Sequence, residues 1–356
     1  MKLRSHSQSF IPLWLILLFT VTCLSTAIDT ISAGQSLTSK QTLISRGGKF
    51  ALGFFSPGNS DKYYVGIWYN HISVQHKTYV WVVNRNSPVS YRSELKLLEN
   101  GNLVLVESYT TKSIWSTNTT ANSMSSSQAV LKNDGNFLLR NSESDVYWQS
   151  FDHPTDTFLP GGWLGYNNRT KESQRLTSWK NVNDPAEGIY SLELDPAGDQ
   201  YHIRWNKTEQ YWSSGQWNGK IFSKVPEMEM NYIYNFSYFT YDVYKSSNIT
   251  TRFVMDITGQ GKQLTWDATS EQWFLIWSRP RQQCEVYAYC GAYGVCNQNA
   301  FTSCKCMEGF EPRSYTDWNM AGFSYGGCVR KKPLKCRKDE FSLMSEGKQS
   351  IRREKF

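Results

Sequence analysis

Short apolar runs separated by Gly, Asn and Pro fill residues 28–157. Three of them lie at residues 49–55, 63–69 and 78–83, and none follows a helical period. Runs of this length, bounded by turn-forming residues, are typical of β-strands. The pattern therefore predicts an all-β domain over this part of the chain.

An internal repeat lies inside this region. LLENGNLVL at residues 97–105 leads to Trp115, and LKNDGNFLL at residues 131–139 leads to Trp148. Each copy has an Asn-Gly or Asp-Gly turn before an alternating strand, and such dipeptides favour hairpins because both residues tolerate a positive φ. A third, looser copy is predicted from Asn59 to Trp68. Repeated hairpins of this kind stack around a shared core.

A turn-rich connector at residues 151–162 leads to a second region of β character, at about residues 175–277. Its landmarks are LTSWK at 176–180, WSSGQWNG at 212–219 and TRFVMDI at 251–257. Aromatic residues make up 15% of the chain, with 14 Trp and 21 Tyr. Since aromatic side chains favour strands, this composition agrees with the all-β prediction.

Six cysteines are clustered near the end of the chain, from Cys284 to Cys328, and none lies between residues 24 and 283. An even set of close cysteines in an exported chain indicates a small module stabilised by disulfides, with fifteen possible pairings. Zinc is not expected, because no Cys-x2-Cys occurs. Calcium is not expected either, since RPRQQ at residues 279–283 has no carboxylate. Cys336 is left over, and we expect its partner to lie outside this sequence rather than in a second chain.

The N-terminus has the three parts of a secretory signal: Lys2 and Arg4, an apolar stretch from Phe10 to Leu24, and a small residue at Ala27. Of the net charge of +7, residues 329–356 carry +6 and residues 1–27 carry +2, so residues 28–328 carry −1. A neutral body argues against nucleic-acid binding. Because no later segment reaches 18 apolar residues, we expect the mature chain to be soluble and secreted.

Five Asn-x-Ser/Thr triplets would be glycosylated in a secreted chain. They begin at Asn118, Asn168, Asn206, Asn235 and Asn248.

Five strings, in order, resemble the extracellular part of plant S-locus glycoproteins and of the G-type lectin S-receptor-like kinases. They are GIWY at 66–69, WVVNRNSP at 81–88, WQSFDHPTDT at 148–157, WSSGQWNG at 212–219 and YCGAYGVC at 289–296. The resemblance runs from about Ile28 to Cys336, which is nearly all of the mature chain.

The resemblance implies a fold class and a domain order. The chain would be all-β, with a bulb-type lectin β-prism of three four-stranded sheets, a β-rich S-locus glycoprotein domain and a small disulfide-stapled EGF-like module. The expected boundaries are a signal peptide at 1–27, the lectin domain at 28–157, the S-locus domain at 158–279, the EGF-like module at 280–328, and a truncated PAN start with a basic disordered tail at 329–356. In the EGF-like module the family pattern would pair Cys284 with Cys296, Cys290 with Cys304, and Cys306 with Cys328.

Mannose-binding relatives build each sugar site on Gln-x-Asp-x-Asn-x-Val-x-Tyr, whose alternation places all five side chains on one face of a strand. Three frames take these positions here: Leu98, Asn100, Asn102, Val104 and Val106; Lys132, Asp134, Asn136, Leu138 and Arg140; and Asn59, Asp61, Tyr63, Val65 and Ile67. No frame keeps all five. Because a lone-sugar site of millimolar affinity has only about 4 kcal/mol to lose, we expect mannose binding to be lost and the turns to remain for the hairpins. Binding of a larger glycan or a peptide across several loops stays open.

Catalysis is not expected. Asp152, His153 and Asp156 lie near Ser150, but no Gly-x-Ser-x-Gly occurs and the string favours turn chemistry instead. There is also no Gly-rich ATP loop and no His-Arg-Asp string of the kind that kinase relatives carry in their cytoplasmic part.

The sequence thus predicts a secreted, glycosylated, non-enzymatic recognition ectodomain that needs no cofactor. Its expected ligand is an extracellular peptide or glycan, including pollen-coat peptides, and its expected partners are a second copy or a membrane receptor kinase. One alternative is a mannose-type lectin. Another is a partial gene model of a membrane receptor-like Ser/Thr kinase, in which case the protein would be at the cell surface; transcript sequence beyond codon 356 distinguishes them.

Overall fold

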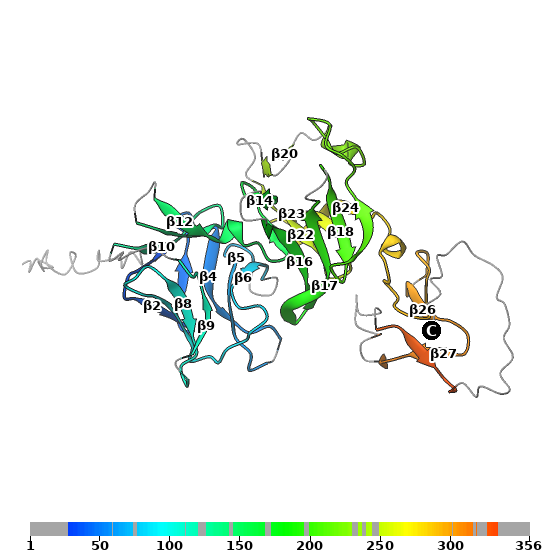
Figure 1. Ribbon diagram of the computed structural model, residues 1–356, viewed down its shortest axis with the longest axis horizontal. Helices are drawn as coiled ribbons and strands as arrows, with labels where there is room; N and C mark the ends of the chain where they lie inside the picture. Colours follow the sequence, from blue (N-terminus) through cyan, green and yellow to red (C-terminus); the bar gives the residue numbers. More distant parts are fainter. Residues whose placement is uncertain are drawn as a thin grey trace, which may run out of the picture. The chain divides into compact units, whose positions relative to one another are not determined.

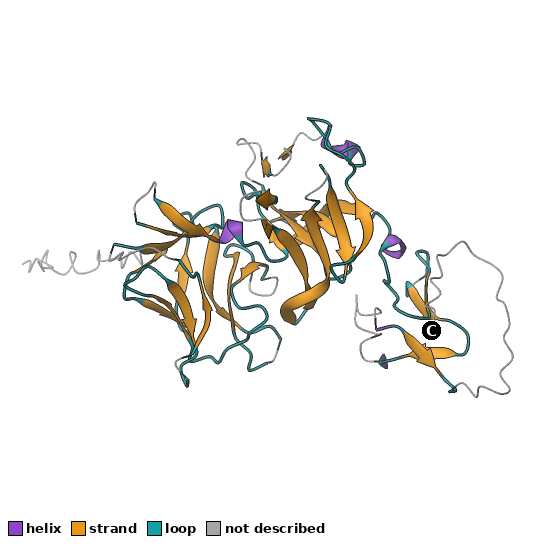
Figure 2. Ribbon diagram, in the orientation of Figure 1, coloured by secondary structure: helices purple, strands orange, loops and turns teal. Residues whose placement is uncertain are grey.

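The computed structural model describes residues 28–333, except 59, 74–76, 111, 120–125, 142–144, 168–171, 196–198, 230–233, 237–239, 244–248, 301, 316–317 and 319–325. The signal segment, Cys336 and the basic tail therefore lie outside the described residues. The named elements are strands and short 3-10 turns, which confirms the all-β class (Figure 2). The chain divides into one compact unit that ends at Arg281 and a second that begins at Gln282.

Three antiparallel four-stranded sheets form the first domain (Figure 1). The first is β1 (Thr30–Ser32), β10 (Gln128–Leu131), β11 (Phe137–Arg140) and β12 (Val146–Gln149). The second is β2 (Ser36–Thr38), β7 (Glu94–Leu97), β8 (Leu103–Val106) and β9 (Ser113–Ser116). The third is β3 (Thr42–Ile44), β4 (Phe50–Phe55), β5 (Tyr64–Tyr69) and β6 (Tyr79–Val82). Their inner faces share one core, as the repeat predicts, and its fully buried members include Leu52, Ile67, Leu95, Leu105 and Leu139.

Residues 30–44, close to the start of the described chain, supply one edge strand to each sheet. The three short strands β1, β2 and β3 begin six residues apart, at Thr30, Ser36 and Thr42, and pair with β10, β7 and β4 respectively. Each buries a single aliphatic side chain, and these are Ile31, Leu37 and Leu43, at 3% exposure each. The chain thus crosses from each sheet to the next and joins all three. We call residues 30–44 the stitching segment.

Each sheet pairs an aliphatic residue of its third strand with a tryptophan of its fourth: Ile67 with Trp81, Leu105 with Trp115, and Leu139 with Trp148. A register shift follows each pair. The third copy of the repeat therefore ends at Trp81, and the prediction that it ends at Trp68 is wrong. The three rings pack edge-to-face, with centroids 6.5 Å apart for Trp81 and Trp115, 6.0 Å for Trp81 and Trp148, and 5.7 Å for Trp115 and Trp148.

The rest of the first unit, which we call the second domain, contains two further four-stranded sheets. One is β16 (Arg175–Asn181), β17 (Asp184–Leu194), β18 (Tyr201–Trp205) and β19 (Glu209–Ser213). The other is β13 (Thr157–Phe158), β22 (Thr250–Met255), β23 (Gly261–Asp267) and β24 (Gln272–Arg279). Two small hairpins and two 3-10 turns complete it: β14 (Tyr166–Asn167) with β15 (Glu172–Ser173), β20 (Tyr234–Phe236) with β21 (Tyr241–Val243), η2 (Ser150–Asp152) and η3 (Pro226–Met228).

The second unit is the small cystine module. It contains η4 (Gln283–Glu285) and the hairpins β25 (Gly294–Cys296) with β26 (Cys304–Cys306) and β27 (Phe310–Pro312) with β28 (Cys328–Arg330). Three disulfides join Cys284 to Cys296, Cys290 to Cys304, and Cys306 to Cys328. These are the pairs that the resemblance implies. Gly294 is required beside them, since a Cβ there would lie 2.2 Å from the carbonyl oxygen of Cys290.

Candidate functional site

Two of the residues predicted to bind sugar, Asn102 and Asn136, use their side-chain amides in hydrogen bonds within the protein. The amide oxygen of Asn102 accepts the backbone N–H of Thr119 at 2.7 Å, and its NH₂ group donates to the Thr119 carbonyl at 3.1 Å. Asn136 is 5% exposed, donates to Gln149 Oε1 at 2.8 Å and accepts from the Ser150 hydroxyl at 3.2 Å. Each amide thus fastens the segment that follows β9 or β12, which leaves little hydrogen-bonding capacity for a sugar.

The next two candidates, Asn100 and Asp134, shape the turns. Asn100 Oδ1 accepts the N–H of Asn102 at 3.1 Å, and Asp134 Oδ1 accepts that of Asn136 at 3.0 Å. Side-chain bonds to the backbone two residues on are typical of Asx turns. The second carboxylate oxygen of Asp134 lies 3.2 Å from the ammonium of Lys132. The polar residues of both frames therefore make hydrogen bonds within the hairpins. This is the role expected if the turns remain because the hairpins need them.

The apolar candidates are poorly accessible. Val104 is 8% exposed and Leu138 is 5% exposed. A sugar ring could contact little of either side chain in this conformation. The structure places the six candidates at equivalent points of two hairpins, but it does not assemble them into an open site.

The predicted third frame is in the wrong register. Val65 and Ile67 are fully buried in the shared core. Gly66, between them, takes the place in the register that Val104 has in the second sheet. Since successive side chains of a strand alternate between faces, Val65 and Ile67 cannot point outward. Asn59, the first member of the frame, lies outside the described residues.

The outward face of β5 is also covered by aromatic rings. Phe55 stacks on Tyr79 with 3.8 Å between centroids, and Trp179, from β16, stacks on Tyr79 at 6.0 Å. A Cβ at Gly66 would lie 2.7 Å from the Phe55 ring, so only glycine fits there. Trp68 on the same face is 6% exposed. The third sheet therefore uses its outer face for packing against the second domain.

Arg85, from WVVNRNSP, joins the two domains of the first unit. It is 8% exposed. Its guanidinium donates three hydrogen bonds to backbone carbonyls of the second domain: to Pro185 at 2.8 Å, to Thr177 at 3.0 Å and to Ser178 at 2.8 Å. Charged donors make the stronger hydrogen bonds, and a buried guanidinium that donates from each of its three nitrogens is costly to replace.

Asp156, from WQSFDHPTDT, is the buried acidic group near this arginine. It is 7% exposed, and burial raises the pKa of its carboxyl, while the positive charges of Arg85 and Arg252 act to lower that pKa. Burial in turn lowers the pKa of both guanidinium groups, which the charge of Asp156 opposes. The carboxylate therefore balances two cations where the domains meet.

Further polar contacts cross the same boundary. They are Tyr69 OH to the Thr251 carbonyl at 2.8 Å, Trp273 Nε1 to the Thr78 hydroxyl at 3.0 Å, and Glu187 N to Asn86 Oδ1 at 2.9 Å. Three of the strings that carry the family resemblance thus contribute to the joint between the two domains: GIWY, WVVNRNSP and WQSFDHPTDT. No pattern in the sequence links these partners, because they lie 101 to 195 residues apart.

The Ser, His and Asp residues of the connector have structural partners. Ser150 is 2% exposed, and its hydroxyl accepts the N–H of Phe137 at 2.9 Å. His153 stacks on Trp148 at 5.4 Å, and Asp152 accepts from Trp163 Nε1 at 3.0 Å. These contacts support the interpretation of this string as turn and packing chemistry.

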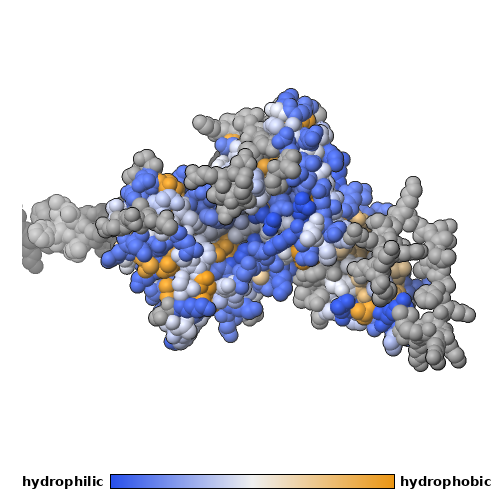
Figure 3. All heavy atoms as spheres, viewed as in Figure 1, coloured by the Kyte–Doolittle hydropathy of each residue, from blue (hydrophilic) through white to orange (hydrophobic). Residues whose placement is uncertain are grey.

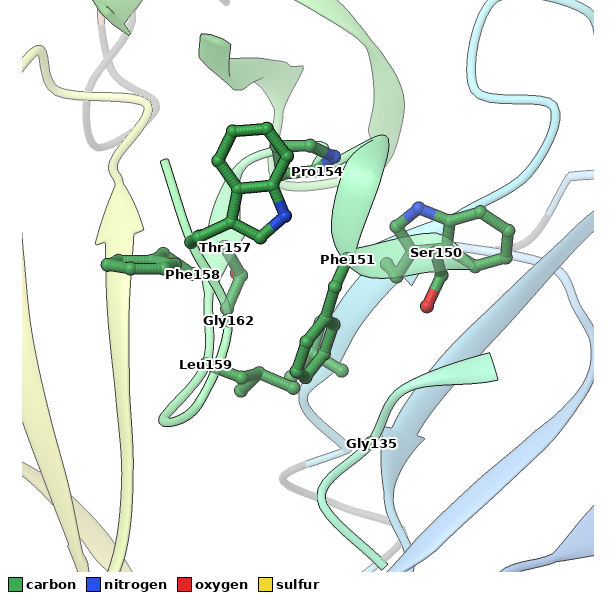
Figure 4. A pocket seen from close by; sticks show the side chains of 11 residues that line it. Gly135, Ser150, Phe151, Pro154, Thr157, Phe158, Leu159 and Gly162 are labelled. Carbon is green, nitrogen blue, oxygen red and sulfur yellow. The ribbon is translucent and has the colours of Figure 1, made fainter. Parts of the chain in front are cut away.

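A small pocket lies beside the connector (Figure 4). Its walls are mainly apolar and include Phe151, Pro154, Phe158, Leu159 and Trp163, and no charged side chain lines it. The described residues also contain no group of three or more His, Cys, Asp or Glu arranged to hold a metal ion. The pocket thus supplies no charged group with which to orient a polar ligand.

The predicted glycosylation sites are partly described. Asn118 and Asn206 are exposed and have positive φ angles of 49° and 47°. The backbone of Asn235 lies in β20, while Asn168 and Asn248 lie outside the described residues. Asn118 and Asn206 stand at surface turns, where a glycan has room.

The sheets and hairpins define the first domain as a bulb-type lectin β-prism. A family model of the D-mannose binding lectin matches residues 78–180, and one of the S-locus glycoprotein domain matches residues 212–314. An S-locus-specific glycoprotein, S6 of Brassica oleracea, is 36% identical over 97% of this chain and 81% of its own length. The chain belongs to the family of S-locus glycoproteins and G-type lectin S-receptor-like kinases.

Other similar proteins are longer or shorter than this chain. A G-type lectin S-receptor-like serine/threonine-protein kinase of Arabidopsis thaliana is 46% identical over 89% of this chain, which spans 40% of that kinase. A monomeric mannose-binding lectin of Gastrodia elata has 21% identity and a TM-score of 0.27, over 34% of this chain and 96% of the lectin. Among the described residues, no helix has the length and apolar character required to span a bilayer.

Proposed function

We propose that this chain is an exported, glycosylated recognition ectodomain that binds an extracellular peptide or glycan through loops. The observation that carries the proposal is the internal use of Asn102 and Asn136. Because these amides hold the hairpins, the lectin domain acts as a scaffold, and loops on a rigid β scaffold usually carry binding. Relatives named as S-locus glycoproteins and as receptor kinases support a role in recognition outside the cell, of the kind used with pollen.

A glycan array tests the loss of mannose binding. We expect wild-type protein to give no mannose signal. A clear wild-type signal that Asp134→Ala abolishes would instead establish the mannose-type lectin. Asp134 suits this test better than Asn136, because its side chain is 39% exposed and its removal costs the turn one hydrogen bond, from the N–H of Asn136. Asn136→Ala would confuse loss of binding with loss of structure.

Export and glycosylation need a separate test. We expect protein expressed in plant cells to be recovered from the medium with N-glycans that an endoglycosidase removes. Asn118→Gln and Asn206→Gln should each remove one mobility step, since both side chains are exposed. Protein that stays in the cytosol without glycans would overturn the proposal. In the same medium, a partner that is a second copy or a receptor kinase would appear as a stable complex on gel filtration.

A further inference from the structure

Two exposed tyrosines flank an exposed arginine on the lectin domain. Tyr91 is 48% exposed and Tyr109 is 66% exposed. The Arg92 guanidinium carbon lies 5.3 Å from the centroid of the Tyr91 ring and 5.6 Å from that of Tyr109. Arg92 Nε also donates to the Tyr91 hydroxyl at 2.7 Å. We call these three residues the Tyr91–Arg92–Tyr109 cluster.

Hydrogen bonds between two loops hold this cluster together. Glu107 accepts the Ser90 hydroxyl at 2.6 Å and the Ser90 N–H at 3.2 Å, which fastens the loop before β7 to the β8–β9 hairpin. The Ser108 hydroxyl donates to the Arg92 carbonyl. Burial raises the pKa of Glu107, but hydrogen bonds from Ser90, Ser93 and Ser108 together outweigh this effect and hold the pKa below its ordinary value. The rings and the guanidinium are thus oriented before any ligand arrives, which lowers the entropic cost of binding.

The chemistry of the cluster suits one class of ligand. Among the described residues no carboxylate is paired with Arg92, so its terminal NH₂ groups are available. A guanidinium binds a carboxylate through two parallel hydrogen bonds. Exposed tyrosine rings present an apolar face with a polar tip, which can cover the C–H face of a pyranose ring. The cluster thus offers both contacts that a sugar acid makes.

We propose that the Tyr91–Arg92–Tyr109 cluster binds an acidic saccharide, a chain of uronic acid units. A carboxylate of the saccharide pairs with Arg92, and the rings of Tyr91 and Tyr109 cover neighbouring sugars. Strand β7, which follows Tyr91 and Arg92, is paired on both sides, with β2 and β8, so the loop of Arg92 offers no free edge to the main chain of a peptide, and the edge strand on this side of the sheet is β9. The site lies apart from the two hairpin frames, so it does not depend on mannose binding.

Calorimetric titration with oligogalacturonides tests this inference. We expect wild-type protein to bind them, and to bind the same oligomers poorly once their carboxylates are methyl-esterified. Arg92→Gln should weaken binding at least about tenfold, because a hydrogen bond to a charged group is lost. Tyr109→Ala should weaken it by a smaller factor.

Arg46→Gln is the matched control, since Arg46 is also exposed, lies on the same domain and makes the same change in net charge. We expect it to bind like the wild type. Equal weakening by Arg46→Gln and Arg92→Gln would show general charge attraction and overturn the inference. So would wild-type protein that does not bind, or equal affinity for the esterified oligomer. Thermal melts of each variant show whether the fold is intact.

Discussion

Single residues carry the joint between the two domains of the first unit, and Arg85 is the clearest case. Its three bonds end on backbone carbonyls, which no substitution on the partner side could remove. The same guanidinium faces the buried Asp156. Without the guanidinium these three buried carbonyls lose their donor, and Asp156 keeps Arg252 as its other nearby cation, so the loss of Arg85 is costly.

We therefore predict that Arg85→Met lowers the free energy of unfolding by about 3–5 kcal/mol. Arg85→Lys should recover only part of this loss, because one ammonium cannot reach three carbonyls in the geometry of the fork. Urea denaturation measures both. Arg46→Met is the control on an exposed arginine, and equal stability of the Arg46 and Arg85 variants would contradict the prediction.

Glu227 gives a prediction for acid pH. Burial raises the pKa of Glu227. A hydrogen bond from its own backbone N–H and the contacts of one of its oxygens with Arg279 and Arg281 outweigh this effect, and together they lower the pKa to about 2 from an ordinary 4.5. A group whose pKa is lower in the folded state stabilises the protein above its unfolded pKa and loses that effect as pH falls. Stability from Glu227 should therefore be complete above pH 4.5 and decline between pH 4.5 and about 2.

Thermal melts across this range check the prediction. Glu227→Gln should be less stable than wild type at pH 6, and the difference should shrink as the pH approaches 2. Glu99→Gln, at an exposed position of the lectin domain, is the control. A difference between Glu227→Gln and wild type that does not change with pH would contradict the prediction, because the pKa of Glu227 would then be the same in the folded and unfolded protein.

At the scale of elements, the hairpins of the repeat depend on one glycine in particular. Gly135 has a φ of +88°, and a Cβ there would lie 2.7 Å from Leu159 and 3.0 Å from Phe50. Gly34 has a similar φ of +80° with no atom within 4 Å of its Cβ position. The two sites share the conformational cost of an alanine, about 1–2 kcal/mol, and differ in the space around it.

We predict that Gly34→Ala costs about 1–2 kcal/mol, and that Gly135→Ala costs a further 1–3 kcal/mol, roughly, because it overpacks the core. Chemical denaturation of both variants gives the difference directly. If Gly34→Ala and Gly135→Ala were equally destabilised, the close contacts with Leu159 and Phe50 would have relaxed without cost.

The sequence predicts the hairpins well where the signal is local. The Asn-Gly and Asp-Gly turns lie next to the strands that they join, so β8 and β11 follow from the pattern. The third copy is harder, because all six residues of β5 are buried and show no alternation from which a face could be assigned. Strands β1, β2 and β3 are three residues long, which is too short for a recognisable alternation. The six-residue spacing of Ile31, Leu37 and Leu43 is the signal that remains in the sequence.

The candidate site is less predictable than the fold. The frames locate Asn102 and Asn136 correctly, but hydrogen bonds to Thr119 and Ser150, which lie beyond the following strand, decide what these amides do. The role of Arg85 depends on partners 92 to 100 residues away. The sequence shows which chemical groups are present, but tertiary packing decides which partner each group binds.

At the scale of the whole chain, stability is divided between two different mechanisms. The first unit has no cysteine in its described residues and depends on a large apolar core, whereas the second has three disulfides in a short segment. A small module without a sizeable core depends on its cross-links. Reduction should therefore unfold one unit and leave the other folded.

We predict that a reductant leaves the tryptophan fluorescence of native protein almost unchanged, because the first unit holds nearly all the tryptophans of residues 28–333. Under the same conditions limited proteolysis should cut within residues 284–328. Cys306→Ser with Cys328→Ser should reproduce part of this sensitivity. A large shift in fluorescence on reduction would mean that the first unit needs the second in order to stay folded.

The stitching segment that contains β1, β2 and β3 has a consequence for how the protein is made. It leaves the ribosome before every strand that it must pair with, and β1 waits for β10, about a hundred residues later. Until then β1 has no partner, and its free edge can pair with other chains. The strand synthesised first is thus among the last of its domain to be paired, and the sheet that contains β1 stays incomplete at least until residue 131 has left the ribosome.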